Sequence, residues 1–226
     1  DMAGFAAAIY KRGIRFAHIP TTLLSQVDAA IGGKTGVNFM GFKNMIGIIQ
    51  QPLFTFECPD VLETLPYEDF VSGSAEMLKS FIIENIDNSY EKAVKTLTEI
   101  HGSANKAEAI KARRVELLEL IHNAAQVKAG VVSRDQFEKG ERKKLNLGHT
   151  FAHAIEKEAD YSISHGKAGA IGMVMAAELS DRLGLSDGNP TARLHDDFQS
   201  CGLPTQSPFP KSTLAEPMSK DKKPEN

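Results

Sequence analysis

Three histidines and one glutamate are the side chains whose types and spacing most directly suggest chemistry. His149 and His153 are four residues apart, so on a helix they lie on one face about one turn from each other. His165 stands just before another helical pattern, and Glu76 is a carboxylate candidate further upstream. A catalytic zinc site uses about three His or carboxylate ligands and keeps one position open. The group therefore predicts a metal site. The alternative is that these histidines are core or capping residues, because a neutral imidazole needs only one donor and one acceptor.

Cationic side chains near these motifs indicate an anionic substrate. Lysine and arginine form strong charge-assisted hydrogen bonds to phosphate and carboxylate groups. The cations that lie near glycines, asparagines or the histidines are Lys34, Lys43, Lys79, Lys128, Arg142 and the pair Lys222-Lys223. A single lysine on a helix is usually a solvated surface residue, so only the whole set carries the indication. The segment Gly32-Gly33-Lys34-Thr35 lacks the spacing of a nucleotide-binding phosphate loop.

Amphipathic helices are expected to position these groups. Apolar residues recur at three- and four-residue spacing over residues 67–86, 88–97, 106–132, 147–159, 167–183 and 191–200. No strong strand signal separates these segments, so they predict a mainly α-helical domain. Residues 218–226 are mostly polar and predict no closing element.

The first part of the chain has a different, mixed pattern. Residues 1–12 predict a helix that ends at Gly13, residues 14–19 a short strand, and residues 21–31 a helix. A glycine-rich turn follows, and then two β-prone runs at 37–39 and 45–49. The predicted fold class is therefore an α/β remnant over residues 1–58 followed by a mainly α-helical metal-binding domain over residues 59–226.

Composition excludes several classes of protein. The chain has 226 residues, of which 42% are hydrophobic and 24% charged, so wholesale disorder is excluded. A formal net charge of −3 argues against nucleic acid as a partner. No apolar run approaches the ~20 residues that span a bilayer, no signal peptide is visible, and two cysteines cannot form a disulfide framework. We therefore expect a cytoplasmic protein with no membrane partner.

In their order along the chain, the motifs resemble those of the 3-dehydroquinate synthase family of sugar-phosphate cyclases. The matching stretches include residues 1–7, 12–16, 19–28, 32–35, 43–47, 75–79 and 145–156, the pair His165-Gly166, and Asp221-Lys222-Lys223. The resemblance covers nearly the whole chain. It implies an N-terminal α/β domain that binds NAD and a helical domain that carries the metal. On this resemblance the chain contains the end of the first domain and most of the second, and the family's glycine-rich pyrophosphate loop would precede Asp1.

The resemblance also implies roles for individual residues. The expected ligands of Zn²⁺ or Co²⁺ are Glu76, His149 and His165. The residues expected to carry the catalysis are His153, which handles protons near the substrate, with Lys79, Lys34, Arg142 and Asn146. The expected substrate contacts are Asn44, Lys128, Lys222 and Arg12, of which Arg12 reaches the site of the neighbouring subunit in a homodimer. The expected NAD contacts are Asp1, Thr21, Thr22, Asp28, Lys34, Lys43, Thr64 and Leu65.

The activity implied by the resemblance is that of a lyase of the shikimate pathway. It converts a phosphorylated seven-carbon sugar acid, 3-deoxy-arabino-heptulosonate 7-phosphate, to 3-dehydroquinate and phosphate. The steps are NAD-assisted oxidation, phosphate elimination, reduction and aldol closure. Arg142, Asn146 and the Lys222 motif favour a substrate with a carboxylate, since such charge would otherwise stay unpaired. The alternatives are another sugar-phosphate cyclase, or a metal-binding fragment that is inactive alone because most of the dinucleotide site is missing.

Overall fold

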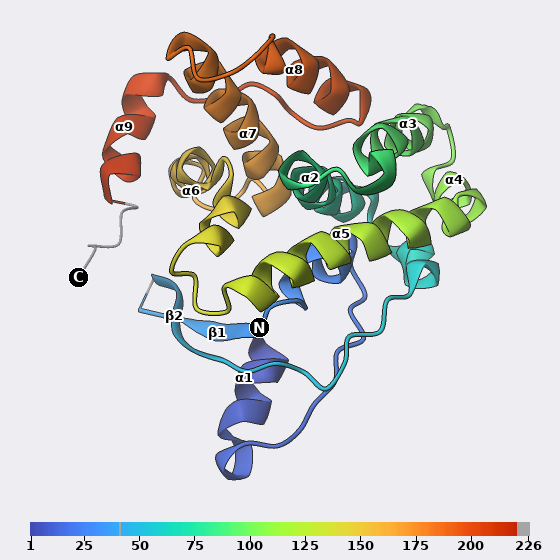
Figure 1. The fold of residues 1–226 in the computed structure, drawn as a ribbon, viewed down its shortest axis with the longest axis vertical. Helices are drawn as coiled ribbons and strands as arrows, with labels where there is room; N and C mark the ends of the chain where they lie inside the picture. The colour runs from blue at the N-terminus through green and yellow to red at the C-terminus, as the bar shows by residue number, and fades with distance from the viewer. Residues whose placement is uncertain (41, 221–226) are drawn as a thin grey trace.

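The computed structural model describes residues 1–40 and 42–220, and most of them are helical (Figure 1). The α-helices are α1 (Met2–Ile9), α2 (Tyr67–Ile83), α3 (Ser89–Gly102), α4 (Lys106–Ala112), α5 (Arg114–Arg134), α6 (His149–Glu158), α7 (His165–Arg182), α8 (Pro190–Ser200) and α9 (Lys211–Lys220). The strands are β1 (Lys34–Phe39) and β2 (Phe42–Ile49). Short 3₁₀ helices occur at Tyr10–Arg12, Pro59–Thr64, Ile86–Asn88 and Glu141–Asn146, and a π-helical turn at Ser25–Ala29. The predicted order, an α/β segment before a mainly α-helical one, is confirmed.

Helix α2 is the centre of the helical part. It packs against α7, α5 and α3, and every residue from Phe70 to Phe81 is buried. The core around it includes the large apolar side chains Leu78, Leu117 and Phe198. Burial on all sides explains why the residues of this stretch are apolar or small, apart from the paired Glu76 and Lys79.

Helices α6, α7 and α9 form a second, smaller cluster. Its buried members are Ala152, Ala154, Ile155, Ala168, Ile171 and Leu214. Helix α9 was not predicted. Its helical sequence pattern is weak, because Pro210 precedes the helix and Pro217 lies inside it. The helix packs on this cluster through fully buried Leu214 and partly buried Met218.

The N-terminal segment contains two separate pairings of extended chain. Strands β1 and β2 form an antiparallel hairpin from Lys34↔Ile49 to Phe39↔Phe42, and α1 packs against β1. The predicted strand at 14–19 is reduced to a short parallel pairing with the segment 53–56. In that pairing the His18 N–H donates to the Phe54 carbonyl at 3.0 Å. Figure 1 shows α1 and the hairpin on the side of α5 opposite α2.

Two predicted helices differ in the structure. The helix expected over 106–132 is broken at Arg113, whose φ of −102° and ψ of 19° divide it into α4 and α5. The break lets α4 pack on the 3₁₀ helix Pro59–Thr64 while α5 packs along α2. The helix expected over 21–31 is shorter and includes the π-helical turn Ser25–Ala29. Among the described helices, none has both the length and the apolarity needed to cross a bilayer.

The approach of α7 to α2 generates a prediction about Gly166. A Cβ atom at this position would lie 1.7 Å from the backbone carbonyl oxygen of Ser72, which cannot move away without shifting α2. We expect Gly166→Ala to lower the free energy of unfolding by at least about 3 kcal/mol, because overpacking against backbone has no flexible neighbour to absorb it. Urea denaturation followed by circular dichroism measures the change. Gly102→Ala is the matched control, since its Cβ would meet nothing within 4 Å. Equal stability of the two variants would contradict the close α2–α7 packing.

Candidate metal centre

Three side chains from three different helices meet at one point in the helical part. Glu76 lies in the middle of α2, His149 is the first residue of α6, and His165 is the first residue of α7. One ligand atom from each lies within 4.8 Å of the others. The structure thus brings together the three residues expected to bind the metal, and their role as ligands is taken up below as a proposal.

Glycines beside the two histidines let the three helices approach this point. Gly148 precedes His149 with a left-handed φ of 76°, and a Cβ there would lie 2.6 Å from the backbone nitrogen of Met173 in α7. Gly166 follows His165 and lies directly against Ser72 of α2. Left-handed backbone and close helix contact both favour a residue without a side chain. These two glycines therefore let the helices approach closely at the positions of the candidate ligands His149 and His165.

Glu76 is almost completely buried, with 1% of its surface exposed. One carboxylate oxygen, Oε2, accepts a hydrogen bond from the ammonium of Lys79, one turn further along α2. The other, Oε1, has no hydrogen-bond partner among the described residues, and the Nε2 atom of His165 lies 3.7 Å from it. A buried acceptor without a partner is unfavourable. The Oε1 lone pairs are therefore available to a cation, and the site fits a metal ion.

Both candidate histidine ligands have Nδ1 engaged in a hydrogen bond. The Nδ1 atom of His149 lies 3.2 Å from the Leu147 carbonyl oxygen, and that of His165 lies 3.0 Å from Oε1 of Glu156. Carbonyl and carboxylate oxygens only accept, so in both rings Nδ1 carries the proton and Nε2 remains for a metal. Burial, with the nearby charge of Lys79, lowers the pKa of His149 to about 4. Its ring is therefore neutral at pH 7, as a metal ligand must be.

His153 lies beside this group. Its ring centroid is 5.4 Å from that of His149 and 6.5 Å from that of His165. The four-residue spacing therefore does place the two α6 histidines together. The expected role of His153 in proton transfer stays a prediction.

An ion pair joins the N-terminal segment to the same region. The ammonium of Lys128, in α5, donates to Oδ1 of Asp28 at 2.6 Å and to its carbonyl oxygen at 2.7 Å. Burial alone would raise the pKa of Asp28, but the positive charges of Lys128 and Lys79 outweigh it and hold that pKa well below its usual range. The expected NAD contact Asp28 and the expected substrate contact Lys128 are thus direct partners.

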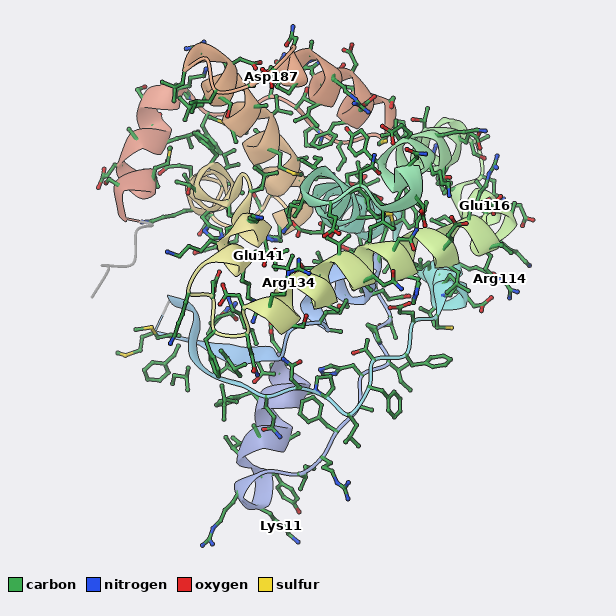
Figure 2. All side chains as sticks on the ribbon, in the orientation of Figure 1. Lys11, Arg114, Glu116, Arg134, Glu141 and Asp187 are labelled. Atoms are coloured by element: carbon green, nitrogen blue, oxygen red, sulfur yellow. The ribbon has the colours of Figure 1, made fainter. Side chains whose placement is uncertain are left out.

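A second polar cluster contains three of the other predicted residues. The ammonium of Lys34 forms an ion pair with Glu138, and Nδ2 of Asn146 donates to Oε1 of the same carboxylate at 2.8 Å. The buried guanidinium of Arg142 donates to the carbonyl oxygens of Gly32 at 3.0 Å and Gln136 at 2.5 Å. Figure 2 shows Arg134 and Glu141, which form a bidentate ion pair, near the end of α5 that faces the hairpin.

The sequence analysis did not identify Glu138. It lies in a loop of mixed charge with no periodicity, and its only signal is its position four residues before Arg142. In the structure it connects Lys34 of β1 with Asn146, which precedes α6. Because this carboxylate contacts two of the residues expected to carry the catalysis, we include Glu138 in the candidate site.

The remaining predicted residues do not join these two clusters through any contact in the described part of the chain. Asn44 is exposed on β2 with a φ of 52°. Arg12 is exposed next to Lys11, which Figure 2 labels at the far end of α1 from the helical part. Thr22 accepts a hydrogen bond from the Ser25 N–H at 3.1 Å; Asp1, Thr21 and Thr64 are exposed, and Leu65 packs on the core. The Lys43 side chain and all of Lys222 lie outside the described residues.

Two family models together match residues 1–224. Residues 1–72 match the family described as 3-dehydroquinate synthase N-terminal, and residues 73–224 match 3-dehydroquinate synthase C-terminal. The boundary near residue 58 stays a prediction. Among curated proteins, the chain is 41% identical over 225 residues to the 3-dehydroquinate synthase of Dehalococcoides mccartyi and 44% identical over 226 residues to that of Halorhodospira halophila. Each alignment covers 99% of this chain but only 60% and 61% of those relatives.

Solved structures of related enzymes share the fold. A 2-deoxy-scyllo-inosose synthase complexed with carbaglucose-6-phosphate, NAD⁺ and Co²⁺ superposes with a TM-score of 0.84 at 28% identity, covering 97% of this chain and 58% of that one. A 2-epi-5-epi-valiolone synthase from Streptomyces hygroscopicus, with NAD⁺ and Zn²⁺ bound, superposes with a TM-score of 0.80 at 28% identity, covering 97% and 59%. The predicted resemblance in fold and family is confirmed.

The buried Glu76–Lys79 pair generates a prediction about stability in the metal-free protein. We expect Lys79→Met to lower the free energy of unfolding by about 3–5 kcal/mol, because it leaves the Glu76 carboxylate buried without its cation. Glu76→Gln should also be destabilising, whereas the double variant should lose less than the sum of the two single losses. Urea denaturation in the presence of a chelator gives all three values.

Lys92→Met is the control for that experiment. Lys92 pairs with Glu119 on the surface, where both side chains are about half exposed. Solvent screens such a pair, so its loss should change stability little. Strictly additive losses in the Glu76/Lys79 cycle would show that the two side chains are not coupled.

Proposed function

This chain belongs to the 3-dehydroquinate synthase family, and from that membership we propose that its protein converts 3-deoxy-arabino-heptulosonate 7-phosphate to 3-dehydroquinate and phosphate. The observation that carries the proposal is the meeting of Glu76, His149 and His165, with one carboxylate oxygen left without a partner. Identities of 41–44% to proteins of that name, against 28% to the structurally related cyclases, favour this member of the group.

The residues fit a divalent metal ion, which we propose is Zn²⁺ or Co²⁺ held by Glu76, His149 and His165. A bound metal would polarise a substrate oxygen, and NAD would take up and return a hydride. Support for these two groups comes from the solved relatives, which hold NAD⁺ with either Zn²⁺ or Co²⁺. The residues of the chain on the NAD side would be Asp1, Thr21, Thr22, Asp28, Lys34, Lys43, Thr64 and Leu65.

The protein's own side chains would bind and orient the substrate. Lys34 and Asn146 already bind a carboxylate, that of Glu138, so this pair is suited to an anionic group of the substrate. Arg142 carries a fixed positive charge beside them. These contacts would fix the substrate's phosphate and carboxylate relative to the metal, with Lys79, Lys128, Asn44 and Lys222 completing the set. Positioning of this kind is a large part of what an enzyme supplies.

Proton transfer is assigned to His153. The residue lies one turn from His149 on α6, so its ring is next to the metal ligands without being one of the three. We propose that it takes and returns a proton at the substrate. A neutral imidazole can take up a proton, and the imidazolium that results can return it.

We further propose that the protein is a cytoplasmic homodimer in which Arg12 contributes to the partner subunit's site. Support comes from the exposed position of Arg12 in the 3₁₀ helix Tyr10–Arg12, from which its side chain could reach a second copy. Sedimentation of the protein with Arg12 intact and with Arg12→Ala would show the state and whether Arg12 affects it.

Metal binding by the chain can be tested directly. We expect Glu76→Ala to lower Zn²⁺ affinity by 100-fold or more relative to the unaltered chain, since it removes one of about three ligands. Competition with a chromophoric chelator measures the affinity. Glu84→Gln, an exposed change at the end of the same helix, is the control and should bind Zn²⁺ normally. Unchanged affinity in Glu76→Ala would remove Glu76 from the ligand set.

The reaction is tested with the full gene product. We expect phosphate release from 3-deoxy-arabino-heptulosonate 7-phosphate that requires both NAD and Zn²⁺ or Co²⁺, and no release from residues 1–226 alone, because the relatives extend well beyond this chain. A colorimetric phosphate assay detects it. Metal- and NAD-loaded protein that instead releases phosphate from a hexose 6-phosphate would assign a different sugar-phosphate cyclase activity; carbaglucose-6-phosphate is the compound bound to the inosose synthase relative.

A further inference from the structure

We propose that Glu156 is a positioning residue that holds His165 in the orientation and tautomer needed for metal binding. This inference rests on the proposed metal site. Glu156 is 4% exposed, and its Oε1 atom lies 3.0 Å from Nδ1 of His165. On the opposite side of the same ring, Nε2 lies 3.7 Å from Oε1 of Glu76. The imidazole is thus held between two buried carboxylates, one of which is the candidate ligand.

The position of Glu156 on α6 makes it suited to this role. It follows His149 by seven residues, which is about two helical turns, so both side chains lie on the same face of α6. That face is packed against α7, which begins at His165. One helix therefore supplies one candidate ligand at its first residue and, near its end, the acceptor that fixes another.

A carboxylate acts differently from the acceptor that His149 uses. The His149 ring is fixed by a neutral backbone carbonyl, that of Leu147, whereas the His165 ring donates to a charged group. A carboxylate acceptor fixes the tautomer with Nε2 unprotonated and makes that nitrogen a stronger ligand. His165 is therefore the histidine whose affinity for a metal depends on a replaceable side chain.

The charge balance of the site supports the same conclusion. Burying a carboxylate is unfavourable unless it is compensated. The ammonium of Lys79 compensates Glu76, and the Nδ1–H of His165 is a hydrogen-bond partner of buried Glu156. A divalent cation between Nε2 of His165 and Oε1 of Glu76 would give the second Glu76 oxygen a partner as well.

The test compares Zn²⁺ affinity in the unaltered chain and in two variants at Glu156. We expect Glu156→Ala to weaken binding by about 10–100-fold, as other changes behind a metal-bound histidine do. Glu156→Gln should weaken it less, because the amide oxygen still accepts from Nδ1 but carries no charge. The visible absorption bands of bound Co²⁺ should shift in both variants, since they report on the ligand field. Glu158→Gln, an exposed change two residues further on, should alter neither measurement.

The outcomes separate this inference from the proposed metal site. If the unaltered chain binds Zn²⁺ and both Glu156 variants bind it equally well with an unchanged Co²⁺ spectrum, Glu156 has no positioning role. If the unaltered chain itself binds neither metal, the metal site and this inference both fail. Glu156→Gln keeps the size of the side chain, so it decides the question if Glu156→Ala does not fold. An affinity order of unaltered, then Gln, then Ala supports the inference.

Discussion

A carboxylate in the middle of the buried stretch of α2, from Phe70 to Phe81, is the constraint on which the rest of this structure depends. Desolvating an ion costs several kcal/mol, so Glu76 needs partners from its surroundings. Lys79, on the same helix, compensates one oxygen, and the first residues of α6 and α7 come to the other. This requires three helices to converge within reach of a single side chain. The convergence explains the glycines at 148 and 166, because any larger residue there would push the histidines away from Glu76.

The N-terminal segment and the helical part are joined through the buried apolar side chains of Leu23 and Val27 and also through charged and polar groups. Lys128 of α5 forms an ion pair with Asp28, and Glu138 forms one with Lys34. The Arg142 guanidinium donates a hydrogen bond to the Gly32 carbonyl oxygen. Each tie links one residue from before position 58 with one from α5 or from the loop that follows it. Four of these residues, Asp28, Lys34, Lys128 and Arg142, are also proposed to contact substrate or NAD. The polar surfaces that join the two parts are therefore the ones that would bind a small charged molecule, as expected for a site between two structural units.

The sequence predicted the candidate ligands better than it predicted their surroundings. The four-residue spacing of His149 and His153 and the helical period around Glu76 are local signals, and the structure bears out the geometry that they imply. Glu138 and Glu156 were missed because a carboxylate in a charged loop or near a helix end has the pattern of a solvated residue. In the structure, Glu138 contacts Lys34 and Glu156 contacts His165. A pattern of neighbouring residues predicts neither these contacts nor the burial of the two carboxylates.

The fold shows the same limit. The hairpin and the long amphipathic helices follow from periodicity, but the break at Arg113 follows from where α4 must pack, on the Pro59–Thr64 turn. Helix α9 was missed because its stability depends on one fully buried side chain, Leu214, supplied to a cluster formed by α6 and α7. A strand at 14–19 depends on a partner strand, and in the described residues it makes only a short pairing with 53–56. Contacts distant in sequence decide all three cases.

Helix α6 connects metal binding to the packing of the fold. It begins with His149, ends near Glu156, and packs through Ile155 against α7, where His165 begins. A shift of α6 along α7 would therefore move a ligand and the acceptor of a second ligand together. A metal that binds only when α6 and α7 are packed together would stabilise that packing by mass action. Metal binding and the α6–α7 contact would therefore be coupled, so that a change in either would affect the other. Closely packed interiors do not deform gradually. The close helix contacts at Gly148, Gly166 and Gly172 would thus contribute to the affinity of the proposed metal site through packing, although none of these residues has a side chain that could touch a metal.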